Sequence, residues 1–199
     1  MYSRRHTREI MKALCLGVFA LFVAGCATYR PVPKGYTGDV AMLEDSFTMA
    51  DGDSCGSFFV LYQYDGHEVD NAISASAQAS YGQGFNWAAL GAQRMVPARG
   101  ATFHLMGRTH CVAPIQEISR TVYFIEGDIL FVPDANQSYV IRGELGPTQS
   151  AVWIEQKQNH AQQGNKLLIK GPSTLGKLKA SAKPEQVPPA EPTSKSASK

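Results

Sequence analysis

Short apolar runs separated by turn residues follow one another through the middle of the chain. The clearest run, Ser57–Tyr64, is rich in aromatic and branched residues and stops at Asp65-Gly66, a dipeptide typical of a hairpin turn. No long stretch has the 3.6-residue period of an amphipathic helix, so the pattern predicts an all-β domain. The frequent turns predict an antiparallel β-sandwich of about 7–8 strands. The expected strands are Val40 to about Phe47, Ser57–Tyr64, Thr102–Thr109, Thr121–Ile125, Ile129–Val132, Ser138–Glu144, Ala151–Glu155 and a weaker Leu167–Ile169.

Two neighbouring apolar pairs, Phe58-Phe59 and Val60-Leu61, stand out within the Ser57–Tyr64 run. Successive side chains of a strand point to opposite faces, so both faces of this strand are apolar. We therefore expect it to be central or covered on both sides.

The segment from Asp70 to Gly100 has the least regular pattern. Within it, Ala72–Ser80 contains alanines that favour a helix and serines that disfavour one. A short helix and an irregular crossover both remain open for this stretch.

The N-terminus contains, in order, the three regions typical of a secretory signal peptide. Basic residues come first, an apolar run Ala13–Ala24 follows, and Val23-Ala24-Gly25-Cys26 closes it. These last four residues resemble the lipobox of bacterial lipoproteins, in which the cysteine is acylated and becomes the new N-terminus. A membrane-spanning helix is the alternative, but Ala13–Cys26 is shorter than the ~20 residues that a span requires. In lipoproteins of enteric type an aspartate after the cysteine favours inner-membrane retention, so Ala27 implies an outer-membrane anchor facing the periplasm.

Composition divides the chain into four zones: a signal peptide over residues 1–25, an acylated cysteine and Pro-containing tether over 26–37, a β-domain over 38–170, and a tail over 171–199. The tail is basic and rich in Pro, Ala, Lys and Ser, so it is predicted to be disordered. Between Cys26 and Ile169, nine Lys and Arg face fourteen Asp and Glu, a net charge of −5. Such a domain is a poor binder of polyanions, which argues against a nucleic-acid partner.

The cysteines predict one disulfide. Cys15 leaves with the signal and Cys26 takes the lipid, so Cys55 and Cys111 remain in an oxidising compartment. Cys55 directly precedes one predicted strand and Cys111 directly follows another. If these strands are antiparallel neighbours or face each other across the sandwich, the two thiols meet. The alternative is two buried, unpaired thiols.

Motifs for catalysis or metal binding fail on inspection. Gly52-Asp53-Ser54-Cys55-Gly56 resembles the nucleophile motif of chymotrypsin-type proteases, but that family needs a preceding histidine and the mature chain has none there. The same segment imitates a calcium loop, but Tyr62 stands where a bidentate Glu is required. His104 and His110 share one strand face at a spacing of ~20 Å, too far apart for one metal. We therefore expect no enzymatic activity, metal site or cofactor.

One predicted loop, Ser80–Trp87, has a composition suited to binding. It alternates glycine with aromatic and amide residues, which suit contact with a partner or a sugar ring. The structural alternative is that its aromatic residues plug an open end of the sandwich. Arg94, further along, is expected to pair with a nearby carboxylate or with a ligand anion. The candidate binding residues are Tyr81, Gln83, Phe85, Asn86, Trp87 and Arg94.

Six short motifs lie between Gly35 and Glu155: Gly35-Tyr36-Thr37-Gly38, Tyr81–Phe85, Val96-Pro97-Ala98, Gly107–His110, Ala113-Pro114-Ile115 and Gly143-Glu144-Leu145. With these motifs the stretch resembles a class of small, largely uncharacterised lipoproteins of Gram-negative envelopes. The resemblance implies a periplasmic β-sandwich and no reaction. The expected function is a non-enzymatic binding or scaffold module with an envelope protein or cell-wall partner. The alternative is an envelope hydrolase or carbohydrate-binding accessory that uses the Tyr81–Trp87 loop and acids such as Asp70.

Overall fold

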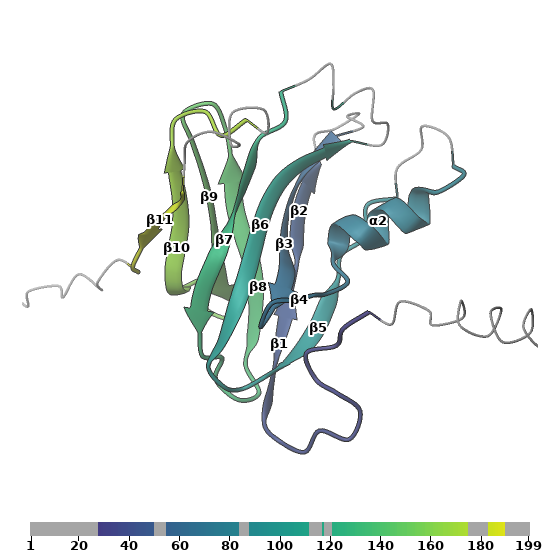
Figure 1. Ribbon diagram of the computed structural model, residues 1–199, viewed down its shortest axis with the longest axis vertical. Coiled ribbons are helices and arrows are strands. Elements are labelled where there is room, and N and C mark those ends of the chain that lie inside the picture. The colour runs from purple at the N-terminus through teal and green to yellow at the C-terminus, as the bar shows by residue number, and fades with distance from the viewer. Residues whose placement is uncertain are drawn as a thin grey trace, which may run out of the picture.

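The computed structural model describes residues 28–49, 55–83, 88–111, 117, 121–174 and 183–189. These residues form two β-sheets and one short helix (Figure 1). The larger sheet has six strands in the spatial order β11 (Glu185–Val187), β10 (Gln162–Lys170), β9 (Gln149–Gln156), β8 (Ser138–Leu145), β1 (Val40–Glu44) and β5 (Gln93–Pro97).

The smaller sheet packs against one face of the larger sheet, and the two share a core. Phe59 and Leu61 of the smaller sheet and Leu43 and Ile141 of the larger sheet are all at most 4% exposed within it. The mostly-β, two-sheet part of the sequence prediction is therefore confirmed. The smaller sheet has five strands: β2 (Ser46–Met49), β3 (Cys55–Tyr64), β6 (Ala101–Cys111) and β7 (Phe124–Phe131) in that order, with β4 (His67–Glu68) paired to β3.

The strand inventory differs from the predicted antiparallel set of seven or eight. β1 runs parallel to β8, with Met42 opposite Ser138. The predicted strand from Val40 to Phe47 is two strands, because the chain passes from the larger to the smaller sheet at Asp45. β4, β5 and β11 have no counterpart among the predicted strands, and the described residues form eleven strands in all.

β7 (Phe124–Phe131) is one continuous strand where the sequence predicts two, Thr121–Ile125 and Ile129–Val132, because the Gly127-Asp128 dipeptide between them is typical of a turn. Gly127 and Asp128 instead pair with Leu105 and His104 of β6. A Cβ at Gly127 would lie only 3.2 Å from Cδ1 of Leu167, so this glycine serves the close approach of β10. Long-range pairing therefore overrides the local turn signal.

The Ala72–Ser80 stretch is the helix α2. Asn71 caps it: its Oδ1 accepts hydrogen bonds from the N–H groups of Ile73 and Ser74, and Oγ of Ser74 accepts from the N–H of Asn71. Oγ of Ser76 accepts from the N–H of Leu90 at 2.9 Å. The serines that argue against a helix by propensity therefore cap it and fasten the following segment to it.

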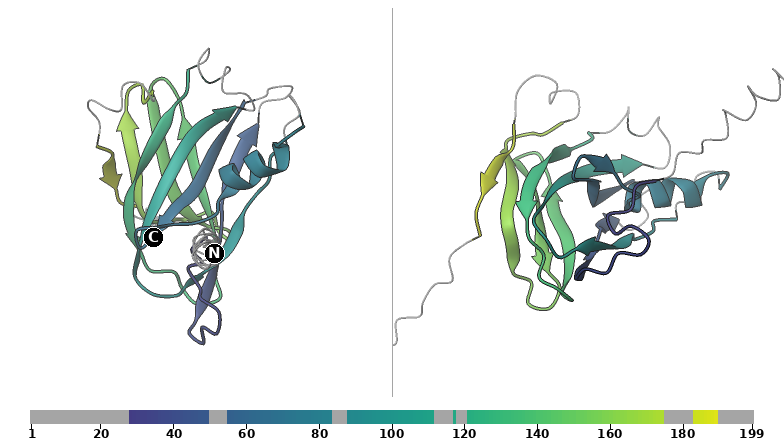
Figure 2. Two further views of the ribbon diagram at one scale, coloured as in Figure 1. Left: turned by 45° about the vertical axis from the view of Figure 1, so that its right-hand side comes forward. Right: turned by 60° about the horizontal axis from the view of Figure 1, so that its bottom comes forward.

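α2 packs on the part of the outer face of the smaller sheet that β3 forms (Figure 2). Phe58 and Val60 of β3 are fully buried there against Ala72. Phe59 and Leu61 point to the opposite side, into the core between the sheets. The prediction that this strand is covered on both faces is confirmed.

The disulfide between Cys55 and Cys111 is present. β3 and β6 are antiparallel neighbours, and the two cysteines stand directly opposite each other in their register. Their Cα atoms are 4.0 Å apart and the S–S distance is 2.11 Å. Adjacent antiparallel strands are one of the two arrangements expected from the sequence.

Parts of the predicted disordered tail belong to the fold. β11 pairs with β10, with Leu167 opposite Gln186. Ser173 is buried, and its Oγ lies 2.5 Å from Oγ of Ser150. The described part of the tail therefore extends the larger sheet by one strand beyond Lys170.

Candidate ligand cavity

Asp45 is the buried residue at which the chain leaves β1 and enters β2. Its Oδ1 accepts hydrogen bonds from the N–H of Leu61 at 3.0 Å and from Nη1 of Arg94 at 2.7 Å. Its Oδ2 accepts from the N–H of Ala72 at 2.8 Å and from Nη2 of Arg94 at 2.6 Å. One carboxylate therefore joins β3, the first turn of α2 and β5.

The Asp45–Arg94 pair lies almost entirely out of water. The Asp45 side chain is 0% exposed and the Arg94 side chain 11%. Burial raises the pKa of the Asp45 carboxyl above its usual value, while Arg94 and the two backbone N–H groups act against that rise. The sequence leaves two partners open for Arg94, a nearby carboxylate and a ligand anion. In the structure Arg94 pairs with a carboxylate, that of Asp45.

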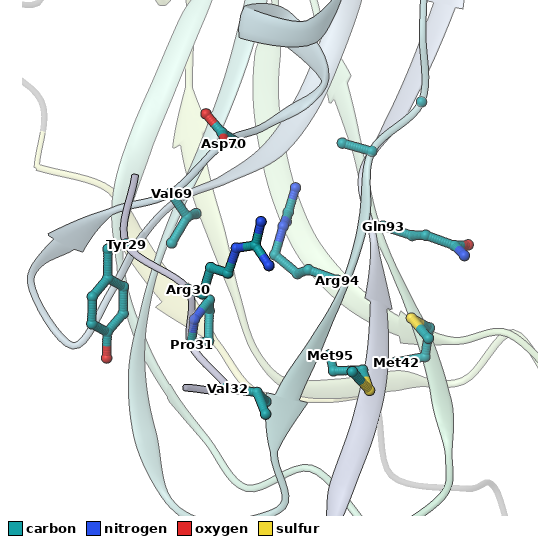
Figure 3. Close-up of a pocket in the computed structure, with 12 residues that line it drawn as sticks. Tyr29, Arg30, Pro31, Val32, Met42, Val69, Asp70, Gln93, Arg94 and Met95 are labelled. Carbon is teal, nitrogen blue, oxygen red and sulfur yellow. The ribbon is translucent and has the colours of Figure 1, made fainter. Parts of the chain in front are cut away.

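A cavity of about 620 Å³ lies beside this ion pair (Figure 3). The cavity is open to solvent on one side, and its volume falls in the range of about 300–1,000 Å³ typical of small-molecule sites. The N-terminal segment forms one wall and β5 forms another. The lining residues are Tyr29–Val32, Met42, Val69–Asp70 and Gly91–Met95.

Two charged side chains in the lining have no ion-pair partner among the described residues, Arg30 and Asp70. Figure 3 shows Arg30 extending from the N-terminal segment toward Arg94. Both oxygens of Asp45 are already engaged by Arg94, so Arg30 has no carboxylate to neutralise it there. The cavity thus presents one cation and one anion that a ligand can pair with.

The remaining walls are largely apolar. Val69 is buried, and Met95 of β5 is 50% exposed. Tyr29 stacks on His67 of β4, with ring centroids 4.4 Å apart, and Pro31 is buried. These contacts hold the N-terminal segment against the domain and keep the cavity wall in place.

The residues predicted for binding lie in different places. Arg94 lines the cavity, whereas Tyr81 and Gln83 do not. Tyr81 is 90% exposed at the end of α2, and Gln83 is exposed as well. The predicted residues Phe85, Asn86, Trp87 and Cys26 lie outside the described residues.

Sequence reasoning misses Arg30 and Asp45 as parts of the site. Asp45 has a local signal, since it is an acid inside the otherwise apolar run from Val40 to Phe47. Arg30 has no such signal, because it stands in a short polar and proline-containing segment that resembles a plain tether.

A second charged cluster surrounds Glu117, near the disulfide. Its carboxylate accepts from Nη2 of Arg108 at 2.6 Å and from the N–H of Cys111 at 3.2 Å, and it contacts Nδ1 of His110 at 2.6 Å. Partial burial opposes ionisation of Glu117, but these three neighbours together outweigh it and lower its pKa. The cluster fastens Glu117 to the C-terminal end of β6.

The two histidines of β6 contact different carboxylates. Nδ1 of His104 lies 2.7 Å from Oδ1 of Asp128, while His110 contacts Glu117. Across the described ranges, three or more His, Cys, Asp or Glu side chains do not come together in a way that could hold a metal ion. In the same ranges the structure has no helix long and apolar enough to span a membrane.

Comparisons of the chain with protein-family models, with curated proteins and with solved structures found no match. The resemblance to envelope lipoproteins therefore stays a prediction. Among the described residues, the cavity is the feature from which a function can be inferred.

Proposed function

We propose that the chain is an outer-membrane-anchored periplasmic lipoprotein and acts as a non-enzymatic binding or scaffold module of the cell envelope. The cavity is its ligand site. The observation that carries this proposal is the position of the cavity, whose wall begins at Tyr29, three residues after Cys26. A ligand site and a membrane anchor would then adjoin each other.

Chain length limits how far the cavity can lie from the anchor. Arg30 is four residues beyond Cys26, and an extended chain spans at most ~3.6 Å per residue, so their Cα atoms are within about 14 Å. Acyl chains on Cys26 would hold the protein firmly, because each buried methylene contributes ~0.8 kcal/mol. The cavity wall would therefore lie close to the lipid headgroups.

The chemistry of the buried acid supports binding rather than catalysis. Asp45 lies behind the lining residue Arg94, and its two oxygens accept four hydrogen bonds. A carboxylate held in this way stabilises the fold and positions Arg94, whereas a general base needs an oxygen that can reach a substrate proton.

The anchor is tested by replacing Cys26 with alanine. Cys26→Ala should leave an unprocessed or soluble form, while wild type fractionates with the outer membrane. Cys15→Ala is the matched control, because Cys15 leaves with the signal and its loss should change nothing. Normal processing and membrane fractionation of Cys26→Ala would contradict the anchor.

The cavity is tested by site-specific photo-crosslinking in cells. Gln93→p-benzoylphenylalanine places a crosslinker in the cavity lining. The control is Leu130→p-benzoylphenylalanine, because Leu130 is 80% exposed on β7 outside the lining. We expect a defined adduct at position 93 only, and its mass reports the class of the bound molecule. Equal adducts at both positions, or none at position 93, would contradict a ligand site in the cavity.

The exposure of Tyr81 supports a second candidate, a carbohydrate-binding accessory or hydrolase of the envelope. An aromatic ring that is 90% exposed can stack on a sugar ring. Tyr81→Ala should then abolish retention of the protein on isolated cell-wall polymer. Tyr36→Ala is the control, because Tyr36 is a partly exposed tyrosine of the N-terminal segment. Retention that is absent in wild type, or equal in both variants, would eliminate this candidate.

A further inference from the structure

We propose that the cavity binds the zwitterionic headgroup of a phospholipid from the leaflet in which the protein is anchored. Arg30 pairs with the lipid phosphate and Asp70 pairs with the lipid ammonium group. This inference rests on the proposed function, because it assigns a ligand class to the same cavity.

The charges of the lining match such a headgroup. Asp45 and Arg94 neutralise each other by two direct hydrogen bonds, so they add no net charge. Arg30 and Asp70 remain, one of each sign, and neither has an ion-pair partner among the described residues. A purely anionic ligand would be repelled by Asp70 and a purely cationic one by Arg30. A molecule that carries charges of both signs can pair with both side chains.

The Arg30 side chain suits the phosphate in particular. A guanidinium offers several N–H donors in a fixed plane and binds phosphate oxygens through charge-assisted hydrogen bonds. Figure 3 shows this side chain extending into the region between the N-terminal segment and β5. Arg94 borders the same region, but its two terminal nitrogens are held by Asp45.

The apolar walls suit the glycerol and first methylenes of the acyl chains. Val32, Met42, Val69 and Met95 all line the cavity. Methionine side chains adapt their shape to irregular apolar ligands. A free phosphate would leave these walls without a contact, so the amphiphilic lipid is the better match.

Dihexanoyl phosphatidylethanolamine, used below its micellar concentration, is the direct probe. Its binding to the full-length protein is compared with that of dihexanoyl phosphatidylglycerol and of inorganic phosphate by titration calorimetry. We expect wild type to bind the ethanolamine lipid at least about tenfold more tightly than the other two. Equal affinity for inorganic phosphate, or equal affinity for the glycerol lipid, would overturn the assignment.

Two variants separate the roles of the charges. Arg30→Gln should weaken binding of both lipids by about tenfold or more, which is the loss expected for a charge-assisted hydrogen bond. Asp70→Asn should weaken only the ethanolamine lipid and leave the glycerol lipid unchanged or tighter. The control is Arg99→Gln, which removes a cation that pairs with Asp65 outside the lining. Unchanged binding in Arg30→Gln or in Asp70→Asn would overturn the proposal.

The crosslinking adduct separates this inference from the proposed function. An adduct at position 93 with the mass of a zwitterionic phospholipid supports both. An adduct with a peptide, a glycan or an anionic lipid overturns the headgroup assignment and leaves the binding module standing. The absence of any adduct specific to position 93 overturns both.

Discussion

Asp45 and Arg94 meet through two parallel hydrogen bonds, from Nη1 to Oδ1 at 2.7 Å and from Nη2 to Oδ2 at 2.6 Å. The same carboxylate accepts the N–H groups of Leu61 and Ala72. The pair therefore joins the two sheets and the helix at one point, and its arginine forms part of the cavity wall.

Breaking this buried pair should destabilise the protein strongly. Arg94→Ala leaves the Asp45 carboxylate buried without a countercharge, so we expect the free energy of unfolding to fall by about 3–5 kcal/mol in urea denaturation at neutral pH. The control is Arg99→Ala, because the exposed Arg99–Asp65 pair is worth less than about 1 kcal/mol. Similar losses in the two variants would show that burial does not govern the strength of the Asp45–Arg94 pair.

The disulfide should supply much of the stability of the domain. Cys55 and Cys111 are separated by 56 residues, and closing a loop of that length stabilises a fold by about 4 kcal/mol in the chain-entropy model. The double variant Cys55→Ser/Cys111→Ser should lose about that much in urea denaturation. Wild type treated with reductant should lose a similar amount. Labelling of both thiols in the mature protein without reductant would contradict the bond.

The Glu117 cluster predicts a pH-dependent contribution to stability. Its folded pKa lies below the ordinary value of 4.5, so its stabilising effect is present above pH 4.5 and is lost as the pH falls through the folded pKa. Glu117→Gln should lower the free energy of unfolding by about 1–3 kcal/mol at pH 7.

Urea denaturation of wild type and Glu117→Gln at pH 7, 5 and 3 tests whether the contribution of Glu117 to stability is lost on acidification. The difference between the two proteins should shrink at the lowest pH. Glu185→Gln is the control, since Glu185 is an exposed acid on β11 and its loss should matter little at any pH. A difference that grows on acidification would refute the assigned direction.

Two buried tyrosines should respond oppositely to loss of the hydroxyl. Tyr64 is fully buried, and its hydroxyl has no hydrogen-bond partner among the described residues, so burial raises its pKa to about 12. Tyr139 is equally buried, but its hydroxyl oxygen accepts from the N–H of Asp134 at 3.0 Å. Tyr64→Phe should be neutral or stabilising by about 1 kcal/mol, whereas Tyr139→Phe should cost about 1 kcal/mol.

Thermal and urea unfolding of the two tyrosine variants rank these effects. Both keep the aromatic ring, so the ring contact of Tyr64 with Phe103 at 5.2 Å is retained in Tyr64→Phe. A larger loss in Tyr64→Phe than in Tyr139→Phe would mean that the Tyr64 hydroxyl has a partner that the described residues do not provide.

Local patterns in the sequence were sufficient for most strands and for the disulfide. The aromatic and branched residues of Ser57–Tyr64 and the Asp65-Gly66 turn are neighbours in the chain, so they can be recognised without the fold. Asp65 and Gly66 indeed have positive φ angles of 47° and 79° at the β3–β4 turn. On the prediction that Cys15 leaves with a signal peptide and Cys26 is acylated, only Cys55 and Cys111 are left to pair, and both flank predicted strands.

Features that depend on contacts between distant segments were decided by the tertiary structure alone. From the sequence Gly127 is typical of a turn, whereas in the structure it lies within β7 and allows Leu167 to pack closely against the strand. The sequence could assign a carboxylate partner to Arg94 but could not identify it, because Asp45 lies 49 residues away, between β1 and β2. The cavity arises where Tyr29–Val32 folds back against β5, and no local periodicity encodes that approach. Strand pattern is a property of neighbouring residues, whereas this site depends on which distant residues share one edge of the sheet.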